Sequence, residues 1–188
     1  MKIPWKRVLM TVPILIGAFV VVLWALSYHT FEFKGGIGVR DSGFFSYPRY
    51  HAQLGHFLLL RAGEYQFAVH GLPSGPLNLA LEVSGITYTQ RAELTSLATT
   101  VSVSITDASG KELCSASGRL SDSKLRGLGS WVLESSSSRS AFWHPACENL
   151  PISRFRTYAV KVTLSAVDPH SPDTQLTPIL EGGGTELP

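Results

Sequence analysis

Residues 156–166 read RTYAVKVTLSA, and apolar and polar side chains alternate along this stretch. The apolar positions are Tyr158, Val160, Val162 and Leu164, and the polar positions between them include Thr157, Lys161, Thr163 and Ser165. Successive side chains of a β-strand point to opposite faces of its sheet, so this pattern predicts a strand that is buried on one face only.

The same period of two recurs along the rest of the chain. It is found in the segments 65–70 (YQFAVH), 77–83 (LNLALEV) and 101–106 (VSVSIT). Clusters of Gly, Pro, Ser and Asp separate eight or nine strand candidates, and residues 90–98 are the one segment after the N-terminal region that favours a short helix. We therefore predict an all-β domain over residues 28–180, an antiparallel β-sandwich of Ig-like or jelly-roll type.

The C-terminal segment contains several prolines. Three of them lie between residues 168 and 178, before a short apolar patch at Ile179 and Leu180. Proline lacks the backbone donor that a central strand needs, so we expect the last strand to lie at a sheet edge. Residues 181–188 are predicted to form a flexible tail.

The longest apolar stretch lies near the N-terminus. Residues 8–26 read VLMTVPILIGAFVVVLWAL and contain no charged side chain. A helix of this length rises about 28 Å at about 1.5 Å per residue, which is close to the hydrocarbon thickness of a bilayer. Lys2, Lys6 and Arg7 precede the stretch, so residues 1–7 are predicted to be a cytoplasmic tail and residues 8–27 a single-pass transmembrane signal-anchor helix in contact with the lipid bilayer.

A cleaved secretory signal is the alternative interpretation of this stretch. Ala25 and Ser27 are small residues at the spacing that a cleavage site requires. The apolar stretch is longer than the roughly 7–15 residues of a usual signal sequence, which favours a retained anchor. Both interpretations place the β-domain outside the cytoplasm. The chain has no Asn-x-Ser/Thr sequon, so we predict a bacterial inner (plasma) membrane with the domain in the periplasm.

Charge and cysteine content limit the kinds of partner. Three of the 16 Lys and Arg residues precede position 8, so the remainder of the chain carries one more acidic than basic side chain. Such a domain has no basic field for nucleic acid. Cys114 and Cys147 are the two cysteines, and in an oxidising compartment we expect them to form a disulfide; two buried free thiols are the alternative for a cytosolic domain. No closely spaced set of metal-ligating residues accompanies them, so no metal or other cofactor is predicted.

Candidate binding residues gather in the segment 41–56, which reads DSGFFSYPRYHAQLGH. They are Phe44, Phe45, Tyr47, Arg49, Tyr50 and His51, together with Trp131 and Trp143 on either side of a serine-rich stretch. Aromatic rings beside polar groups suit stacking on sugars or docking of a partner protein. The alternative is that the phenylalanines complete the core and that a tryptophan packs beside the disulfide.

No coherent catalytic set is found in the sequence. There is no Gly-x-Ser-x-Gly elbow, and the carboxylates Glu64, Glu82, Glu93 and Glu112 fall in separate segments. We therefore predict a protein that is not an enzyme: a binding or assembly module of the cell envelope, whose partner protein can pair with an open sheet edge. The alternative is a carbohydrate-binding module that faces the cell wall or exported glycans, and an envelope hydrolase is the least favoured interpretation.

Overall fold

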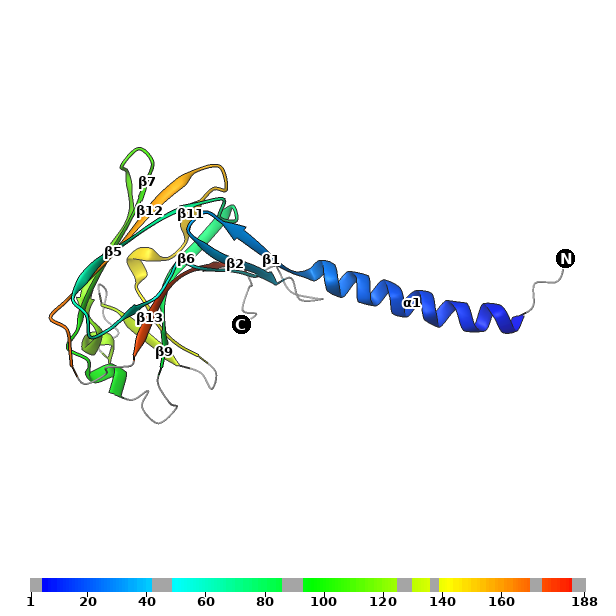
Figure 1. The fold of residues 1–188 in the computed structure, drawn as a ribbon, viewed down its shortest axis with the longest axis horizontal. Helices are drawn as coiled ribbons and strands as arrows, with labels where there is room; N and C mark the ends of the chain where they lie inside the picture. The colour runs from blue at the N-terminus through cyan, green and yellow to red at the C-terminus, as the bar shows by residue number, and fades with distance from the viewer. Residues whose placement is uncertain are drawn as a thin grey trace.

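The computed structural model describes residues 5–41, 49–85, 93–124, 130–135, 139–169 and 174–183. Three of the predicted site residues, Phe44, Phe45 and Tyr47, lie outside these ranges. The α-helix α1 (Trp5–Ser27) projects from a β-rich body and leads directly into strand β1 (Figure 1). Judged on the helical residues whose side chains are described, 12–25, no helix is long and apolar enough to cross a membrane.

The described strands form two antiparallel sheets. The large sheet has the order β1 (Tyr28–Phe33), β2 (Gly36–Asp41), β3 (Arg49–Gln53), β13 (Gln175–Gly182), β6 (Gly75–Ser84), β10 (Ser140–Trp143) and β9 (Val132–Ser135), with β4 (Phe57–Leu58) beside β13 and β11 (Leu150–Ile152) beside β6. The small sheet has the order β5 (Gly63–His70), β12 (Thr157–Ser165), β7 (Thr100–Asp107) and β8 (Glu112–Arg119). This confirms the prediction of an antiparallel all-β domain, and the two sheets are consistent with a β-sandwich.

Short 3-10 helices complete the described body. They are η2 (Leu120–Lys124), η3 (Pro145–Cys147) and a turn over residues 93–96, which lies inside the segment predicted to favour a short helix.

The core lies between the two sheets. In β12, Tyr158, Val160, Val162 and Leu164 are at most 2% exposed, and the residues between them face outward, as the alternation predicted. Leu79 and Leu81 of β6 join the same buried cluster from the large sheet, and Val103 of β7 joins it from the small sheet. Figure 1 shows β5, β7 and β12 in one layer and β2, β6 and β13 in the other.

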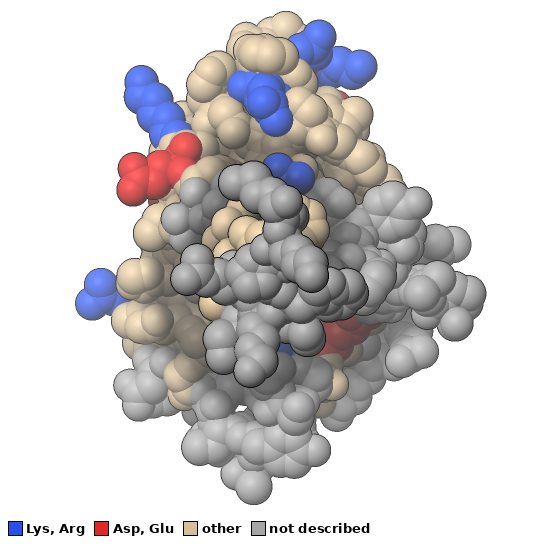
Figure 2. Space-filling model, turned by 90° about the vertical axis from the view of Figure 1, so that its right-hand side faces the viewer, with Lys and Arg blue, Asp and Glu red and all other residues tan. Residues whose placement is uncertain are grey.

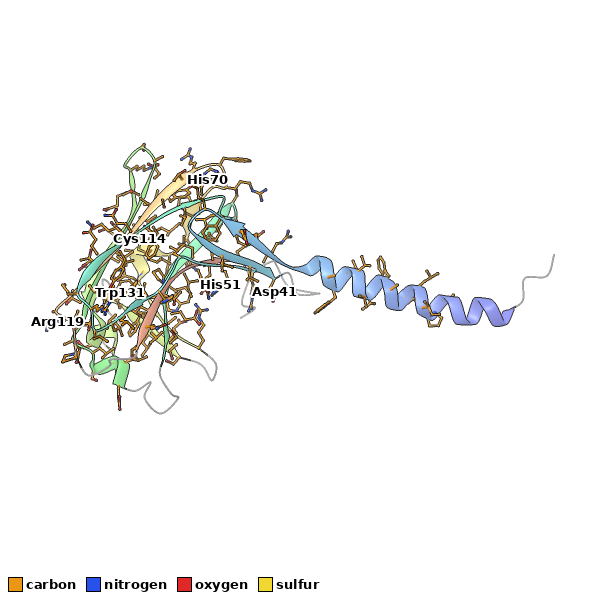
Figure 3. The ribbon with its side chains drawn as sticks, viewed as in Figure 1. Asp41, His51, His70, Cys114, Arg119 and Trp131 are labelled. Atoms are coloured by element: carbon orange, nitrogen blue, oxygen red, sulfur yellow. A yellow bond between two sulfur atoms is a disulfide. The ribbon has the colours of Figure 1, made fainter. Side chains whose placement is uncertain are left out.

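A disulfide links the two layers. Cys114 in β8 of the small sheet bonds to Cys147 in η3, which follows β10 of the large sheet. Both cysteines are buried, with Cα atoms 5.1 Å apart (Cys114 is labelled in Figure 3). The predicted bridge is confirmed.

The position of the last strand corrects the sequence prediction. β13 is not an edge strand, because it pairs with β6 on one side and with β3 and β4 on the other. The carbonyl of Pro178 accepts a hydrogen bond from the backbone N–H of Leu54. In an antiparallel strand the N–H and C=O of one residue point to the same side, so the nitrogen of Pro178 also faces residues 54–56. These residues interrupt the ladder between β3 and β4, so a proline, which lacks the N–H, is tolerated there. β13 also continues to Gly182, beyond the predicted domain end at residue 180.

Candidate functional site

The outer face of the large sheet carries a mixed set of polar and aromatic side chains. Directly paired residues of neighbouring strands share a face. The register pairs Val39 with His51, His51 with Glu181 and Glu181 with Asn78, across β2, β3, β13 and β6. Their neighbours along the strands, such as Leu180, are buried in the core. This row of side chains therefore faces away from the core.

A cleft of about 1210 Å³ opens on this outer face. Its charged and aromatic lining consists of Asp41, Arg49, Tyr50, His51, Glu134, Arg139, Trp143, Glu148 and Glu181. These side chains come from β2, β3, β9, β10, β13 and the segments that flank β10. Residues distant in the sequence thus meet in one concave surface.

An ion-pair network fixes the centre of the cleft. Arg139 Nη1 donates a hydrogen bond of 2.9 Å to Glu181 Oε2, and Arg139 Nε lies 3.7 Å from Glu82 Oε1. His51 Nδ1 lies 3.4 Å from the same Glu181 oxygen. The Arg139 guanidinium carbon lies 5.9 Å from the centre of the Trp143 ring, within the range of a cation–π contact. Arg139 therefore connects the aromatic ring of Trp143 to the charged side chains at the centre of the cleft.

The environment of Glu181 favours its ionised form. Burial alone would raise the pKa of this carboxyl group, because a low-dielectric environment disfavours charge. The hydrogen bonds to His51 and Arg139 and the positive charge of these groups act in the opposite direction, and the net effect lowers the pKa below its ordinary value. Glu181 is therefore a permanent acceptor at neutral pH, which suits recognition of donors and not proton donation by a general acid.

Four of the predicted site residues meet in the cleft. Arg49, Tyr50 and His51 line it from β3, and Trp143 lines it from β10. The prediction that Trp131 (labelled in Figure 3) contributes to a ligand site is wrong, because its side chain is fully buried and its Nε1 donates a hydrogen bond to the Val101 carbonyl. Its ring also contacts His144, just before η3, so Trp131 is a core residue beside the segment that leads into η3.

Sequence reasoning missed the centre of the network. Glu82 is not a predicted site residue, because no second carboxylate lies near it in the sequence, and Glu181 lies in the segment predicted to form a tail. A partial signal existed for Glu82, since it occupies a polar position in the alternating segment 77–83. The segment 175–182 gives a weaker signal, because Pro178, Ile179 and Leu180 form an apolar run directly before Glu181. Arg139, the common partner of the two glutamates, lies beside a serine-rich stretch, where the sequence shows no period at all.

Over the ranges that the structure describes, no group of three or more His, Cys, Asp or Glu side chains is arranged to hold a metal ion. No protein-family model matches the chain, and a search of curated proteins found no significant match.

Proposed function

We propose that this chain is a membrane-anchored binding module of the bacterial cell envelope and that its ligand or partner occupies the cleft on the large sheet. The observation that carries this proposal is the preordered network of Arg139, Glu181, His51 and Trp143 in a cleft. Polar groups held by one another at a concave surface need little rearrangement on binding, which reduces the entropic cost of association.

The anchor part of the proposal rests on the sequence. The uncharged stretch 8–26 lies within α1, and its apolar side chains Ile14, Leu15 and Phe19 are each more than 60% exposed. Such side chains need an apolar environment, and a lipid bilayer provides one. Lys and Arg side chains are exposed on the upper part of the face from which the helix projects (Figure 2), where anionic headgroups would attract them.

The strand order supports a jelly-roll topology over an Ig-like one. Eight strands, counted along the chain as β3, β5, β6, β7, β8, β10, β12 and β13, pair first with last, second with seventh, third with sixth and fourth with fifth. A long antiparallel hairpin ladder that wraps into two layers produces this nested pairing, which is the arrangement of a jelly roll. Such folds carry binding sites in many unrelated proteins, so the topology is compatible with several functions.

Binding is favoured over catalysis by the state of Glu181, the carboxylate at the centre of the network. A glycosidase needs one carboxyl group that stays protonated near neutral pH. Glu82 and Glu181 instead share one guanidinium, and the pKa of Glu181 is lowered. The cleft is therefore proposed to recognise a ligand, not to catalyse its hydrolysis.

The test is site-specific photo-crosslinking in intact cells. A photoreactive amino acid replaces Glu134, which is exposed in the cleft, and a matched control replaces Ala159, which is exposed on the outer face of the small sheet. We expect a specific crosslinked product at position 134 and none at 159. Equal labelling at the two positions would contradict the assignment of the cleft as the binding site. The periplasmic location of the domain is tested separately, by fusing to the C-terminus a reporter that works only in the cytoplasm. Activity of that fusion would contradict the periplasmic location.

A carbohydrate is the second candidate ligand, favoured by a specific observation. Trp143 and Tyr50 line the same cleft as the donors and acceptors of Arg139, Glu181 and Asn78. Sugars present an apolar ring face to aromatic side chains and hydroxyl groups to polar ones. Replacement of Trp143 by alanine should abolish binding on a glycan array, with the urea-unfolding midpoint preserved as the folding control.

A further inference from the structure

We infer that the cleft recognises a glycan with free amino groups, that is, a polymer of deacetylated amino sugars. The inference rests on the proposed function of the cleft as a binding site and specifies its ligand. The lining contains four acidic side chains, Asp41, Glu134, Glu148 and Glu181, against two arginines, Arg49 and Arg139. A ligand that carries positive charge therefore complements the cleft better than a neutral or acidic one.

The excess negative charge is concentrated at one end of the cleft. Asp41 and Arg49 are paired across β2 and β3, so their charges offset each other. At the other end, one guanidinium, that of Arg139, serves both Glu181 and Glu82. The register places Ala141 of β10 between Glu82 of β6 and Glu134 of β9, so the backbones of the two glutamates are about 10 Å apart. An ammonium group bound on this part of the face is attracted by both carboxylates.

The aromatic side chain of Trp143 lies beside the end of the cleft that carries the excess negative charge. Trp143 follows Ala141 by two residues on β10, so the two side chains share the outer face. An amino sugar combines an apolar ring face, which can pack on the indole, with an amine, which can approach the glutamates. A cleft of about 1210 Å³ exceeds the roughly 300–1,000 Å³ of sites for single drug-sized molecules, so it accommodates several sugar rings.

A basic peptide is the competing occupant, and the geometry of the sheet argues against it. The charged centre of the cleft lies on the face of the sheet, where the backbone groups of β13 are already paired with β3 and β6, and the edge strand β9 borders the cleft beyond β10. A peptide lying there would find few main-chain partners for its own amides, whereas strand addition takes place at a sheet edge. The hydroxyl groups of a sugar need only side-chain partners, and Asn78, Arg139 and Glu181 provide them.

The experiment compares two oligosaccharides that differ only in charge and acetylation. Full-length protein in detergent micelles is titrated by calorimetry with β-1,4-linked glucosamine tetramer and with the N-acetylglucosamine tetramer, at about pH 5.5, where amines are protonated and ordinary carboxylates are mostly ionised. We expect the amine tetramer to bind at least about tenfold more tightly, and we expect about 0.5 M salt to reduce its affinity much more than that of the acetylated tetramer.

Three variants locate the effect. Glu134→Gln is exposed, so it should fold normally and reduce the preference for the amine tetramer several-fold, while Trp143→Ala should weaken both tetramers. Glu64→Gln, on the outer face of the small sheet, is the matched control and should change neither affinity. Equal affinity for the two tetramers would overturn the inference, and the cleft would then be a glycan site without a preference for free amino groups. An oligolysine peptide that binds as tightly as the amine tetramer would also overturn it.

Failure of the inference is distinguishable from failure of the proposed function. If neither tetramer binds but position 134 crosslinks to a protein in cells, the ligand assignment is wrong and the cleft remains a binding site. If neither tetramer binds and position 134 gives no specific product, both proposals are wrong.

Discussion

Breaking the Cys114–Cys147 disulfide should produce a large and calculable loss of stability. The cysteines are 33 residues apart in the sequence, and in the chain-entropy model a closed loop of about this length stabilises the fold by about 3.7 kcal/mol at 25 °C. For a domain of this size, each kcal/mol corresponds to about 2–4 °C in Tm, so reduction should lower the Tm by about 7–15 °C. Both sulfur atoms are buried, so the reduced wild type keeps its packing while losing the covalent link.

The assay is urea unfolding of the oxidised and reduced protein and of a Cys114→Ala/Cys147→Ala variant, followed by tryptophan fluorescence. Trp131 is fully buried between the sheets and reports directly on the core. Reduction should also increase the m-value, because an unfolded chain without the link exposes more surface. A change in unfolding free energy below about 1 kcal/mol would refute the loop-entropy reasoning. Free thiols in protein taken directly from cells would refute the oxidising location.

Three further outcomes test the core, the network and the sheet, each by urea unfolding. Trp131→Phe should destabilise the domain by about 2–4 kcal/mol, since it leaves a cavity and removes the hydrogen bond to Val101, whereas Trp143→Phe should cost less than about 1 kcal/mol. The pKa of Glu181 is lowered in the folded state, so the ionised carboxylate stabilises the fold above the ordinary carboxyl pKa, and this contribution is lost as the pH falls through the lowered pKa. Between about pH 6 and pH 3 the wild type should therefore lose more unfolding free energy than Glu181→Gln. Parallel pH profiles of the two proteins would contradict the network. Gly182→Ala should destabilise the sheet by about 1–3 kcal/mol, because a Cβ there would collide with the Pro76 carbonyl and with Leu77, and an unchanged midpoint would show that β13 and β6 can separate at low cost.

The strands could be predicted wherever the core sets a strict period. In β12 the buried residues fall at every second position, because the strand covers the core with one face and meets solvent with the other. In β6 the core residues Leu77, Leu79, Leu81 and Val83 follow the same period, although Ala80 on the opposite face is also buried. The two cysteines were likewise informative, since an even pair in an oxidising compartment has few alternatives. These features depend on local pattern or on composition, and both are readable from one sequence.

The order of the strands could not be predicted in the same way. Pro178 indicated an edge strand, and nothing nearby in the sequence shows that residues 54–56 leave a gap opposite its missing donor. Trp131 and Trp143 were equivalent candidates in the sequence, yet one is buried in the core and the other lines the cleft. The difference arises from the tertiary environment, which a periodicity of side chains does not specify.

The core and the cleft depend on a single register. β13 lies between β3 and β6, so Leu180 meets Leu79 on the core face while its neighbour Glu181 meets His51 on the outer face. A slip of one residue would turn Glu181 into the core and expose Leu176 and Leu180, exchanging buried apolar surface for a buried charge. The hydrophobic residues that stabilise the sandwich therefore also keep Glu181 within reach of Arg139. The geometry of the network follows from the packing on the opposite face of the same strand.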